Sequence, residues 1–333
     1  MTQPKFFSRS IYICIALLFC WLSPIILAQV DQVKKYPEKP VRLVVPFAAG
    51  GTSDVLARLI GLKLSEAVGQ QVIIENRPGA NGNIGSDVVA KASPDGYTLL
   101  LAADGTIVIN PSLYRNLSFN PEKDLAPISR VALVPLIIVA NPQLKASNIV
   151  ELVALSKAPD AHLNFSSAGQ GSTGHLAGEL LKNQSGLRMT HVPYKGGGQA
   201  ITDVVSGQVP IIVTAIATAG PFIKSGQLKA LAVTSSMRIN AAPTIPTLNE
   251  SGVTGFNVSS WYGFMAPAGT PSPIIKKLNA ELSSIMQQPD VKAKLEMLGA
   301  EPMTDTPEAF ARAIQTDTTR WASIIKAANL VIQ

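Results

Sequence analysis

The 333-residue chain is long enough for one large domain or two medium-sized ones. Hydrophobic residues make up 47% and charged residues 15%, a composition that excludes an intrinsically disordered protein. The formal net charge of +6 favours an anionic small ligand through long-range attraction, and the lack of a Lys/Arg run excludes tracking of a nucleic-acid backbone.

The first residues have the layout of a secretory signal peptide. Lys5 and Arg9 precede an apolar stretch that ends at Leu27, and polar sequence begins directly after Ala28. We therefore expect residues 1–28 to direct export to the periplasm, with cleavage after Ala28. An uncleaved membrane anchor is the alternative, but the stretch is short for a membrane span and contains a proline.

Both cysteines, Cys14 and Cys20, lie inside this segment. A lipoprotein would use Cys20, but Phe19 stands before it where a small residue is required. The mature protein would have no cysteine, and therefore no disulfide, no thiolate metal site and no cysteine nucleophile. We expect it to need no cofactor.

Short β-rich runs then alternate with helical patterns. The predicted strands are Val41–Phe47, Gln71–Glu75, Thr98–Ala103, Ile128–Val139, Leu163–Ser166, Arg188–His191, Pro210–Thr214 and Leu228–Thr234. The predicted helices are Ser53–Val68, Asn148–Lys157, Thr173–Gln184, Ser272–Met286, Val291–Leu298 and Pro307–Ala328. This alternation predicts an α/β fold with a mainly parallel sheet and helices on its faces.

The first candidate site is the turn between the first predicted strand and helix. It comprises Phe47, Ala48, Ala49, Gly50, Gly51, Thr52, Ser53 and Asp54. The two glycines allow a tight turn with free N–H groups, and the hydroxyls lie at the positive start of a helix. These features predict an anion-binding turn. The alternative is an ordinary turn in which Ser53 or Asp54 caps the helix.

A second loop of the same kind precedes the predicted helix Thr173–Gln184. Its candidate residues are Ser167, Ala168, Gly169, Gly171, Ser172, Thr173 and His175. Two such loops facing each other across a cleft would form one anion site. The glycines also fit G-x-G-x-x-G, but no acid follows about twenty residues later, as a dinucleotide site would require. His175 could donate to a carboxylate or bond within the turn.

Patterns typical of enzymes are missing from the sequence. Gln170 stands where a G-x-S-x-G elbow around Ser172 would need its first glycine. The spacing of His162, His175 and His191 matches no metal site. We therefore do not expect catalysis.

Three further places could contribute to a cleft. Asp104 ends a predicted strand, and it could reach the cleft or belong to a plain turn. Trp261 belongs to an aromatic cluster that could form a cleft wall, a domain-crossing strand or core packing. The Tyr194–Gly198 loop lacks phosphate-loop spacing and is interpreted as a turn lining the cleft.

Six strings occur in a fixed order along the chain. They are Tyr36–Asp54 (YPEKPVRLVVPFAAGGTSD), Glu75–Gly85 (ENRPGANGNIG), Pro94–Leu99 (PDGYTL), Asn110–Tyr114 (NPSLY), His191–Gly196 (HVPYKG) and Trp261–Pro271 (WYGFMAPAGTP). In these strings the sequence resembles the Bug receptors, the substrate-binding components of tripartite tricarboxylate transporters. The resemblance covers essentially the whole mature chain.

The resemblance implies a two-lobed periplasmic binding fold of type II that closes on its ligand. Lobe 1 would comprise residues 36–137 and 258–333, and lobe 2 would be the inserted residues 138–257. The crossing strands would lie near 134–139 and 258–264. The resemblance further implies that both glycine loops hold one carboxylate of a small ligand, partly through ordered waters. It implies a monomeric receptor whose partners are integral membrane transporter subunits.

Departures from the family concern ligand specificity. Where members that bind amino acids often have an Asp, this chain has Ile212–Ala217, with Thr214 on the expected cleft wall, and Pro210. An ammonium group would lack a counter-charge there, so we expect an organic acid without an α-amino group. Asp104 replaces a frequent Asn and could bind an amine or repel a second carboxylate.

Two other functions stay open at this stage. One is a ligand-dependent sensor partner of a membrane kinase, which sequence cannot separate from a transport receptor. The other is an enzyme on a related α/β scaffold, which would need a base placed beside a nucleophile.

Overall fold

The computed structural model describes residues 35–327, and the predicted export signal, residues 1–28, lies outside the described residues. The elements below belong to a compact unit that begins at Lys39. None of the helices within residues 35–327 is both long and apolar enough to cross a membrane.

One group of strands forms the first half of the sheet. It contains β1 (Val41–Val45), β2 (Val72–Asn76), β3 (Thr98–Ala103), β9 (Ser259–Pro267) and the short β10 (Glu301–Pro302). β1 pairs in parallel with β2 and β3, whereas β9 runs antiparallel to β3 and β4. β1 is almost wholly buried, as expected for a strand covered by helices on both faces.

The other half of the sheet contains β5 (Asn164–Ser167), β6 (Thr190–Pro193), β7 (Ile211–Ala215) and β8 (Lys229–Val233). β5 pairs in parallel with β6 and β7. β7 and β8 run antiparallel to the end of β4. Each half therefore has a parallel core of three strands with antiparallel strands added to it.

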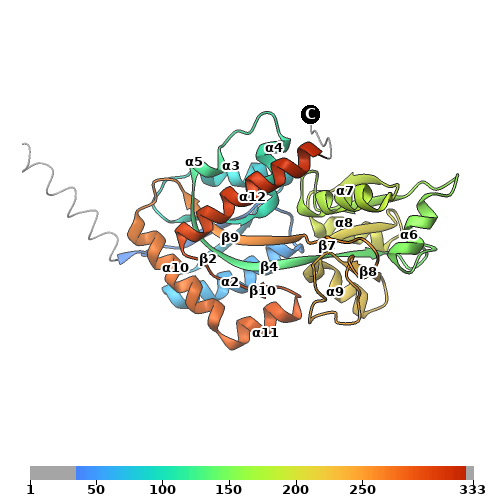
Figure 1. Ribbon diagram of the computed structural model, residues 1–333. Coiled ribbons are helices and arrows are strands. Elements are labelled where there is room, and N and C mark those ends of the chain that lie inside the picture. The colour runs from blue at the N-terminus through green and yellow to red at the C-terminus, as the bar shows by residue number, and fades with distance from the viewer. Residues whose placement is uncertain (1–34, 328–333) are drawn as a thin grey trace, which may run out of the picture. The chain divides into compact units, whose positions relative to one another are not determined.

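Strand β4 (Leu125–Ala140) belongs to both halves. Its first part, up to Pro135, pairs with β9, and from Leu136 onward it pairs with β7 and β8. Figure 1 shows β4 running from the region of α2, α10 and α11 into the region of α6 to α9. The sequence pattern predicts a shorter strand, Ile128–Val139, within this element.

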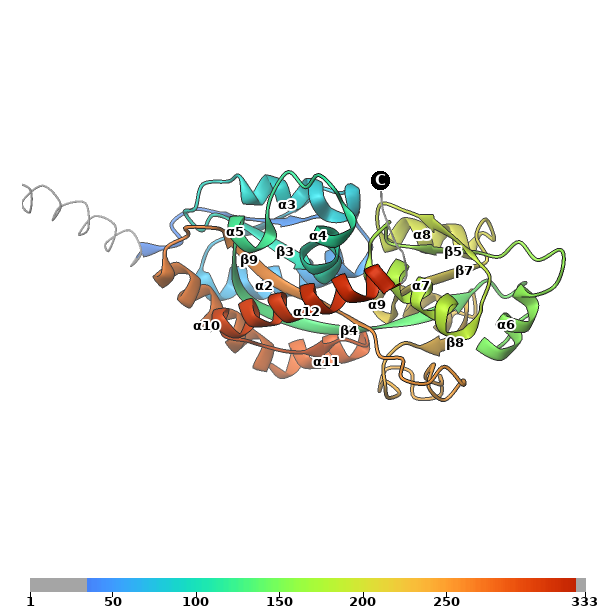
Figure 2. The same cartoon turned by 45° about the horizontal axis from the view of Figure 1, so that its top comes forward.

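The helices cover the faces of both halves. They are α2 (Thr52–Val68), α3 (Asn83–Ala90), α4 (Asn110–Leu113), α5 (Pro121–Asp124), α6 (Ile149–Ser156), α7 (Thr173–Ser185), α8 (Gly197–Val205), α9 (Ile216–Lys224), α10 (Ser272–Gln287), α11 (Pro289–Met297) and α12 (Pro307–Ala327). The short turns η1 (Ala80–Gly82) and η2 (Gly105–Ile109) precede α3 and α4. In Figure 2, α12 lies lengthwise over β4 and β9.

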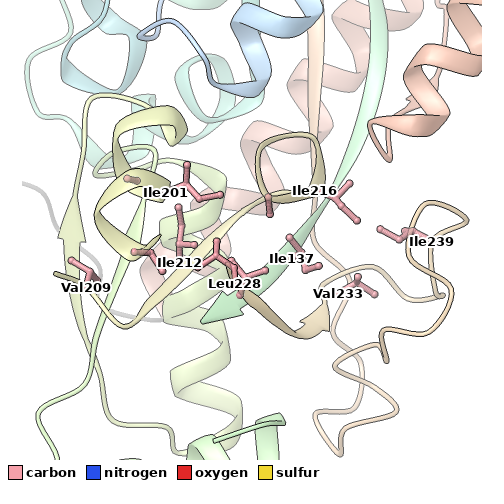
Figure 3. Close-up of a cluster of buried hydrophobic side chains, with 12 residues drawn as sticks. Ile137, Ile201, Val209, Ile212, Ile216, Leu228, Val233 and Ile239 are labelled. Atoms are coloured by element: carbon pink, nitrogen blue, oxygen red, sulfur yellow. The ribbon is translucent and has the colours of Figure 1, made fainter. Parts of the chain in front are cut away.

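A buried apolar cluster fixes α8 and α9 on the second half of the sheet. It joins Ile201 of α8 and Ile216 of α9 to Ile137 of β4 and Ile212 of β7, all at most 5% exposed. Figure 3 shows these side chains pointing toward one another. Full burial of such a side chain contributes about 1.5–3 kcal/mol. The cluster therefore holds the first residues of both helices in place at the edge of the sheet.

Candidate functional site

A cavity of about 60 Å³ lies at the carboxyl ends of β1, β3, β5 and β7. Ligands of α/β sheets commonly bind at this edge, where loops leave the strands. The predicted site residues that line the cavity are Phe47, Gly51, Thr52, Ser53, Asp104, Ala168, Ser172, Thr173 and Thr214. Both predicted loops therefore contribute to one cavity.

Four helices begin at the cavity wall. Thr52 starts α2, Thr173 starts α7 and Gly197 starts α8, and α9 begins directly after Ala215. Each helix start carries about half a positive charge and presents backbone N–H groups without intrahelical partners. The walls also hold hydroxyls from both halves of the sheet. This arrangement suits an anion, which would accept hydrogen bonds from several directions.

The first loop is held in shape from behind by Asp54. Its Oδ2 accepts from the Gly50 N–H at 3.1 Å and from Arg58 Nε at 3.0 Å, and its Oδ1 accepts from Asn76 Nδ2 at 3.1 Å. Although burial raises the pKa of Asp54, these hydrogen bonds outweigh it and lower the pKa below the usual value. Asp54 is thus an ionised brace of the loop, and it does not line the cavity.

The second loop rests on a serine–histidine network. Ser167 Oγ lies 2.7 Å from His191 Nε2 and accepts a hydrogen bond of 3.0 Å from Ser172 Oγ. The rings of His191 and His175 stack with centroids 3.9 Å apart. The network connects Ser172 in the cavity wall to side chains behind it.

Both histidines of this network are neutral. Burial lowers the pKa of His175 to about 4 and that of His191 to about 2. His175 Nδ1 accepts from the Gly171 N–H at 3.0 Å, so this histidine bonds within the turn. It supports the loop from outside the cavity lining.

Hydrogen bonds also join the two halves of the sheet around the cavity. Thr52 Oγ1 lies 2.9 Å from Thr218 Oγ1, and Thr173 Oγ1 donates to Asp104 Oδ2 at 2.8 Å. At the rim, the Ala48 N–H donates to the Lys195 carbonyl at 3.3 Å. The loops therefore meet across the cavity, and a guest would be enclosed between them.

Asp104 is the acidic residue of the cavity wall and is only 1% exposed. Burial raises its pKa to about 7, although hydrogen bonds from Ser260, Thr173 and the Gly105 N–H partly oppose the shift. Burial and the nearby Asp104 charge likewise raise the pKa of Tyr262 to about 12. The Tyr262 hydroxyl is therefore a protonated donor in the cavity.

Strand β9 shows why one predicted residue is absent from the cavity. Ser260 and Tyr262 line it, and Trp261 between them lies on the other side of the pleat. There the Trp261 indole packs edge-on against Phe310 at 5.2 Å and donates to Asp317 Oδ2 at 2.8 Å. Trp261 thus joins the strand to α12 and is not a cleft wall.

The remaining predicted residues surround the lining without forming it. Ala48, Ala49, Gly50, Gly169 and Gly171 shape the loops by their backbone, while Asp54, Ser167, His175 and Trp261 act as the supports described above. Gly50, Gly169 and Gly171 have φ values of +82°, +156° and +82°, which disfavour other residues. Their assignment as ligand-binding residues stays a prediction.

Sequence reasoning did not single out several lining residues. They are Asn81, Ala103, Gly105, Leu136, Gly174, Gly197, Val213, Ala215, Thr218, Ser260 and Tyr262. Asn81 precedes α3 in a left-handed conformation, φ 49°, and donates to Asn110 Oδ1 at 2.8 Å. Its string ENRPGANGNIG was recognised, but nothing in that string indicates which residue faces the cavity.

Metal binding has no support in the part of the chain that the structure describes. No group of three or more His, Cys, Asp or Glu side chains there could hold an ion. Among the described residues that line the cavity, none is Lys or Arg. An anion in this cavity would be held by helix starts, hydroxyls and backbone amides.

Comparison with known proteins identifies the family. The family model described as "Tripartite tricarboxylate transporter family receptor" matches residues 56–330. The chain is 37% identical over 292 residues to Protein BugT of Bordetella pertussis, covering 87% of this chain and 90% of BugT.

Solved structures share the fold over nearly their whole length. The periplasmic binding protein BugD superposes with a TM-score of 0.85 at 37% identity, covering 89% of this chain and 99% of that one. Rpa4515 of R. palustris, solved with adipate, gives 0.86 at 35% identity, covering 88% and 98%. MatC of Rhodopseudomonas palustris, solved with bound malate, gives 0.83 at 35% identity, covering 87% and 100%.

These likenesses confirm the predicted α/β fold and the resemblance to the Bug receptors. The family and the fold are those of solute-binding proteins and not of enzymes. The chain belongs to the tripartite tricarboxylate transporter family receptors, and it has the two-lobed fold of periplasmic binding proteins.

Proposed function

We propose that this protein is a periplasmic receptor that captures a small organic carboxylate and delivers it to the membrane subunits of a tripartite tricarboxylate-type transporter. The observation that carries the proposal is the convergence of four helix starts on one cavity that Lys and Arg do not line. Such a cavity favours an anion that accepts many hydrogen bonds over a cation or an apolar guest.

The energetics of this proposal are adequate. Hydrogen bonds to a charged group contribute about 1.5–3 kcal/mol each. The hydroxyls of Thr52, Ser53 and Thr173, together with backbone N–H groups, offer at least four donors. After association costs of several kcal/mol, this set is sufficient for micromolar or tighter binding. The adipate- and malate-bound neighbours support a carboxylate as the ligand class.

The guest that we propose has no α-amino group. The cavity wall formed by Val213, Thr214 and Ala215 offers an ammonium group a hydroxyl and carbonyls but no carboxylate. Asp104 is the one acid among the described lining residues, and its oxygens already accept hydrogen bonds from neighbouring groups. A neutral body therefore fits the cavity better than an ammonium group.

Receptor function would also use the parts of the chain around the cavity. Residues 1–28 would serve as the export signal, cleaved after Ala28. Residues 36–137 with 258–333 and residues 138–257 would be the two lobes, which move about β4 and the segment before β9. Closure would be a population shift, driven by contacts that the guest makes only in the closed form.

A thermal-shift screen of the mature protein against a panel of carboxylic acids tests this proposal. A guest that binds the folded state alone raises the melting temperature by mass action. We expect non-amino carboxylic acids to raise it, and titration calorimetry on the strongest of them to give micromolar affinity. If no carboxylate shifts the melting temperature, or if aspartate and glutamate alone do so, the proposal is wrong.

A further inference from the structure

Asp104 places a fixed negative charge inside a cavity whose other features favour an anion. It follows β3 directly, is 1% exposed and lines the cavity together with Thr52 and Ser172. A cavity built for anions gains nothing from an internal carboxylate unless that group restricts which anions enter. The surroundings of Asp104 indicate what the restriction is.

The oxygens of Asp104 are occupied by donors from the protein itself. Thr173 Oγ1 donates to Oδ2 at 2.8 Å, Ser260 Oγ donates to Oδ1, and the Gly105 N–H donates as well. A carboxylate offers about four acceptor sites, so these bonds leave little capacity for a guest ammonium group. Asp104 therefore acts on a guest mainly through its charge.

The charge balance of the cavity allows one guest carboxylate and not two. The starts of α2, α7, α8 and α9 together supply about two positive charges. The described lining residues include no Lys or Arg that would add to this. Ionised Asp104 uses about half of that positive charge, and one guest carboxylate uses the rest. A second guest carboxylate would be enclosed near Asp104 without compensation, which is costly in a buried site.

Apolar groups complete the wall. Phe47, Ala103, Leu136 and Val213 line the cavity beside the polar groups. They suit the uncharged body of an acid, whereas a second carboxylate against them would lose its hydration.

We infer that Asp104 restricts this receptor to acids with a single carboxylate group and an uncharged body, and excludes dicarboxylates. This inference rests on the proposed function, because it specifies which carboxylates the same cavity accepts. It separates this chain from neighbours solved with adipate or malate, each of which carries two carboxylates.

Calorimetry at pH 8 with matched acids tests the inference. The probes are butanoate with succinate and hexanoate with adipate, because each pair differs by one carboxylate at constant chain length. We expect the wild type to bind the monocarboxylate at least about tenfold more tightly than its partner diacid, as like charges within a buried cavity repel. In Asp104→Asn, which keeps the shape, the ratio should fall to within about threefold.

Asp317→Asn is the matched control. It removes the same charge at a residue that accepts from Trp261 and does not line the cavity. We expect it to keep the wild-type ratio. Equal wild-type affinity for both members of a pair, or an unchanged ratio in Asp104→Asn, overturns the inference and leaves the proposed function standing. If the wild type binds none of these four acids and no other carboxylate, the proposed function itself fails.

Discussion

Thr52 Oγ1 lies 2.9 Å from Thr218 Oγ1, although the two residues are 166 positions apart in the chain. One hydroxyl belongs to the first turn of α2 and the other to the first turn of α9. This hydrogen bond crosses the cavity between the two halves of the sheet. A guest carboxylate would meet both hydroxyls at once.

We predict that Thr218→Val weakens carboxylate binding about five- to tenfold, because it removes one hydroxyl donor and leaves a methyl in its place. Thr218→Ser keeps the hydroxyl and should bind within about twofold of the wild type. Calorimetry with the tightest acid from the screen provides the measurement. Equal affinity in all three proteins would show that the α9 start does not contact the guest.

Gly51 allows a test of charge separate from bulk. A Cβ added there would lie 3.6 Å from the N atoms of Gly197 and Gly198, which is ordinary van der Waals contact. Gly51→Ala should therefore fold normally and lose at most about threefold in affinity. Gly51→Asp adds a like charge and should weaken every carboxylate by about tenfold or more. Unchanged affinity in Gly51→Asp would remove the first loop from the site.

Carboxylate affinity should rise as the pH falls from 8 to 6. The pKa of Asp104 is raised to about 7, so acidification neutralises it and removes the like charge beside the guest. The other groups that face it do not titrate in this range, because the pKa of His175 is lowered to about 4 and that of Tyr262 is raised to about 12. Asp317 on α12 contributes a negative charge that raises the pKa of Asp104 further.

The pH profile of Asp104→Asn checks this assignment. Its affinity should be flat between pH 6 and 8. The folded-state pKa of Asp104 is raised above the ordinary 3.8, so its contribution to stability is full below pH 4 and is lost as the pH rises through 7. Asp104→Asn should therefore melt at a higher temperature than the wild type at pH 8. A sloping affinity profile in the variant would assign the titration to another group.

The serine network behind the second loop should matter for both stability and binding. Ser167→Ala leaves His191 Nε2 and the Gly169 N–H without their hydroxyl partner, at a cost of about 1–3 kcal/mol in the free energy of unfolding. It should also weaken binding, because Ser172 loses the group that orients its hydroxyl. Urea unfolding and calorimetry measure the two effects.

The neighbouring Ser166 offers the control for this variant. Its hydroxyl donates to the Ile211 carbonyl at 3.2 Å and takes no part in the network. Ser166→Ala should lose some stability and keep the wild-type affinity. If both variants bind equally well, the network has no influence on Ser172.

How much of the site was predictable depends on the local pattern. The loops at Gly51 and Ser172 were predicted because a β-rich run, glycines and hydroxyls precede a clear helical pattern. The start of α9 was missed because Ile211–Ala217 is one apolar run, with no N-cap residue to mark where β7 ends and the helix begins. The run also lacks any polar residue that would separate strand from helix.

Strand β9 illustrates a second limit. Trp261 and Tyr262 are adjacent in an aromatic cluster, and which of them faces the cavity depends on the register of β9 against β3 and β4. No pattern within the cluster sets that register. The charge of Asp104 was visible in the sequence, whereas its enclosure by Thr173 and Ser260 depends on segments far apart in the chain.

A crystal structure of the mature protein with its tightest carboxylate tests the central claim most directly. We predict that the carboxylate oxygens lie about 3 Å from hydroxyl or N–H groups of both the Thr52–Ser53 turn and the Ser172–Thr173 turn, directly or through one water. A guest bound outside the cavity, or one whose carboxylate contacts neither turn, would contradict the account.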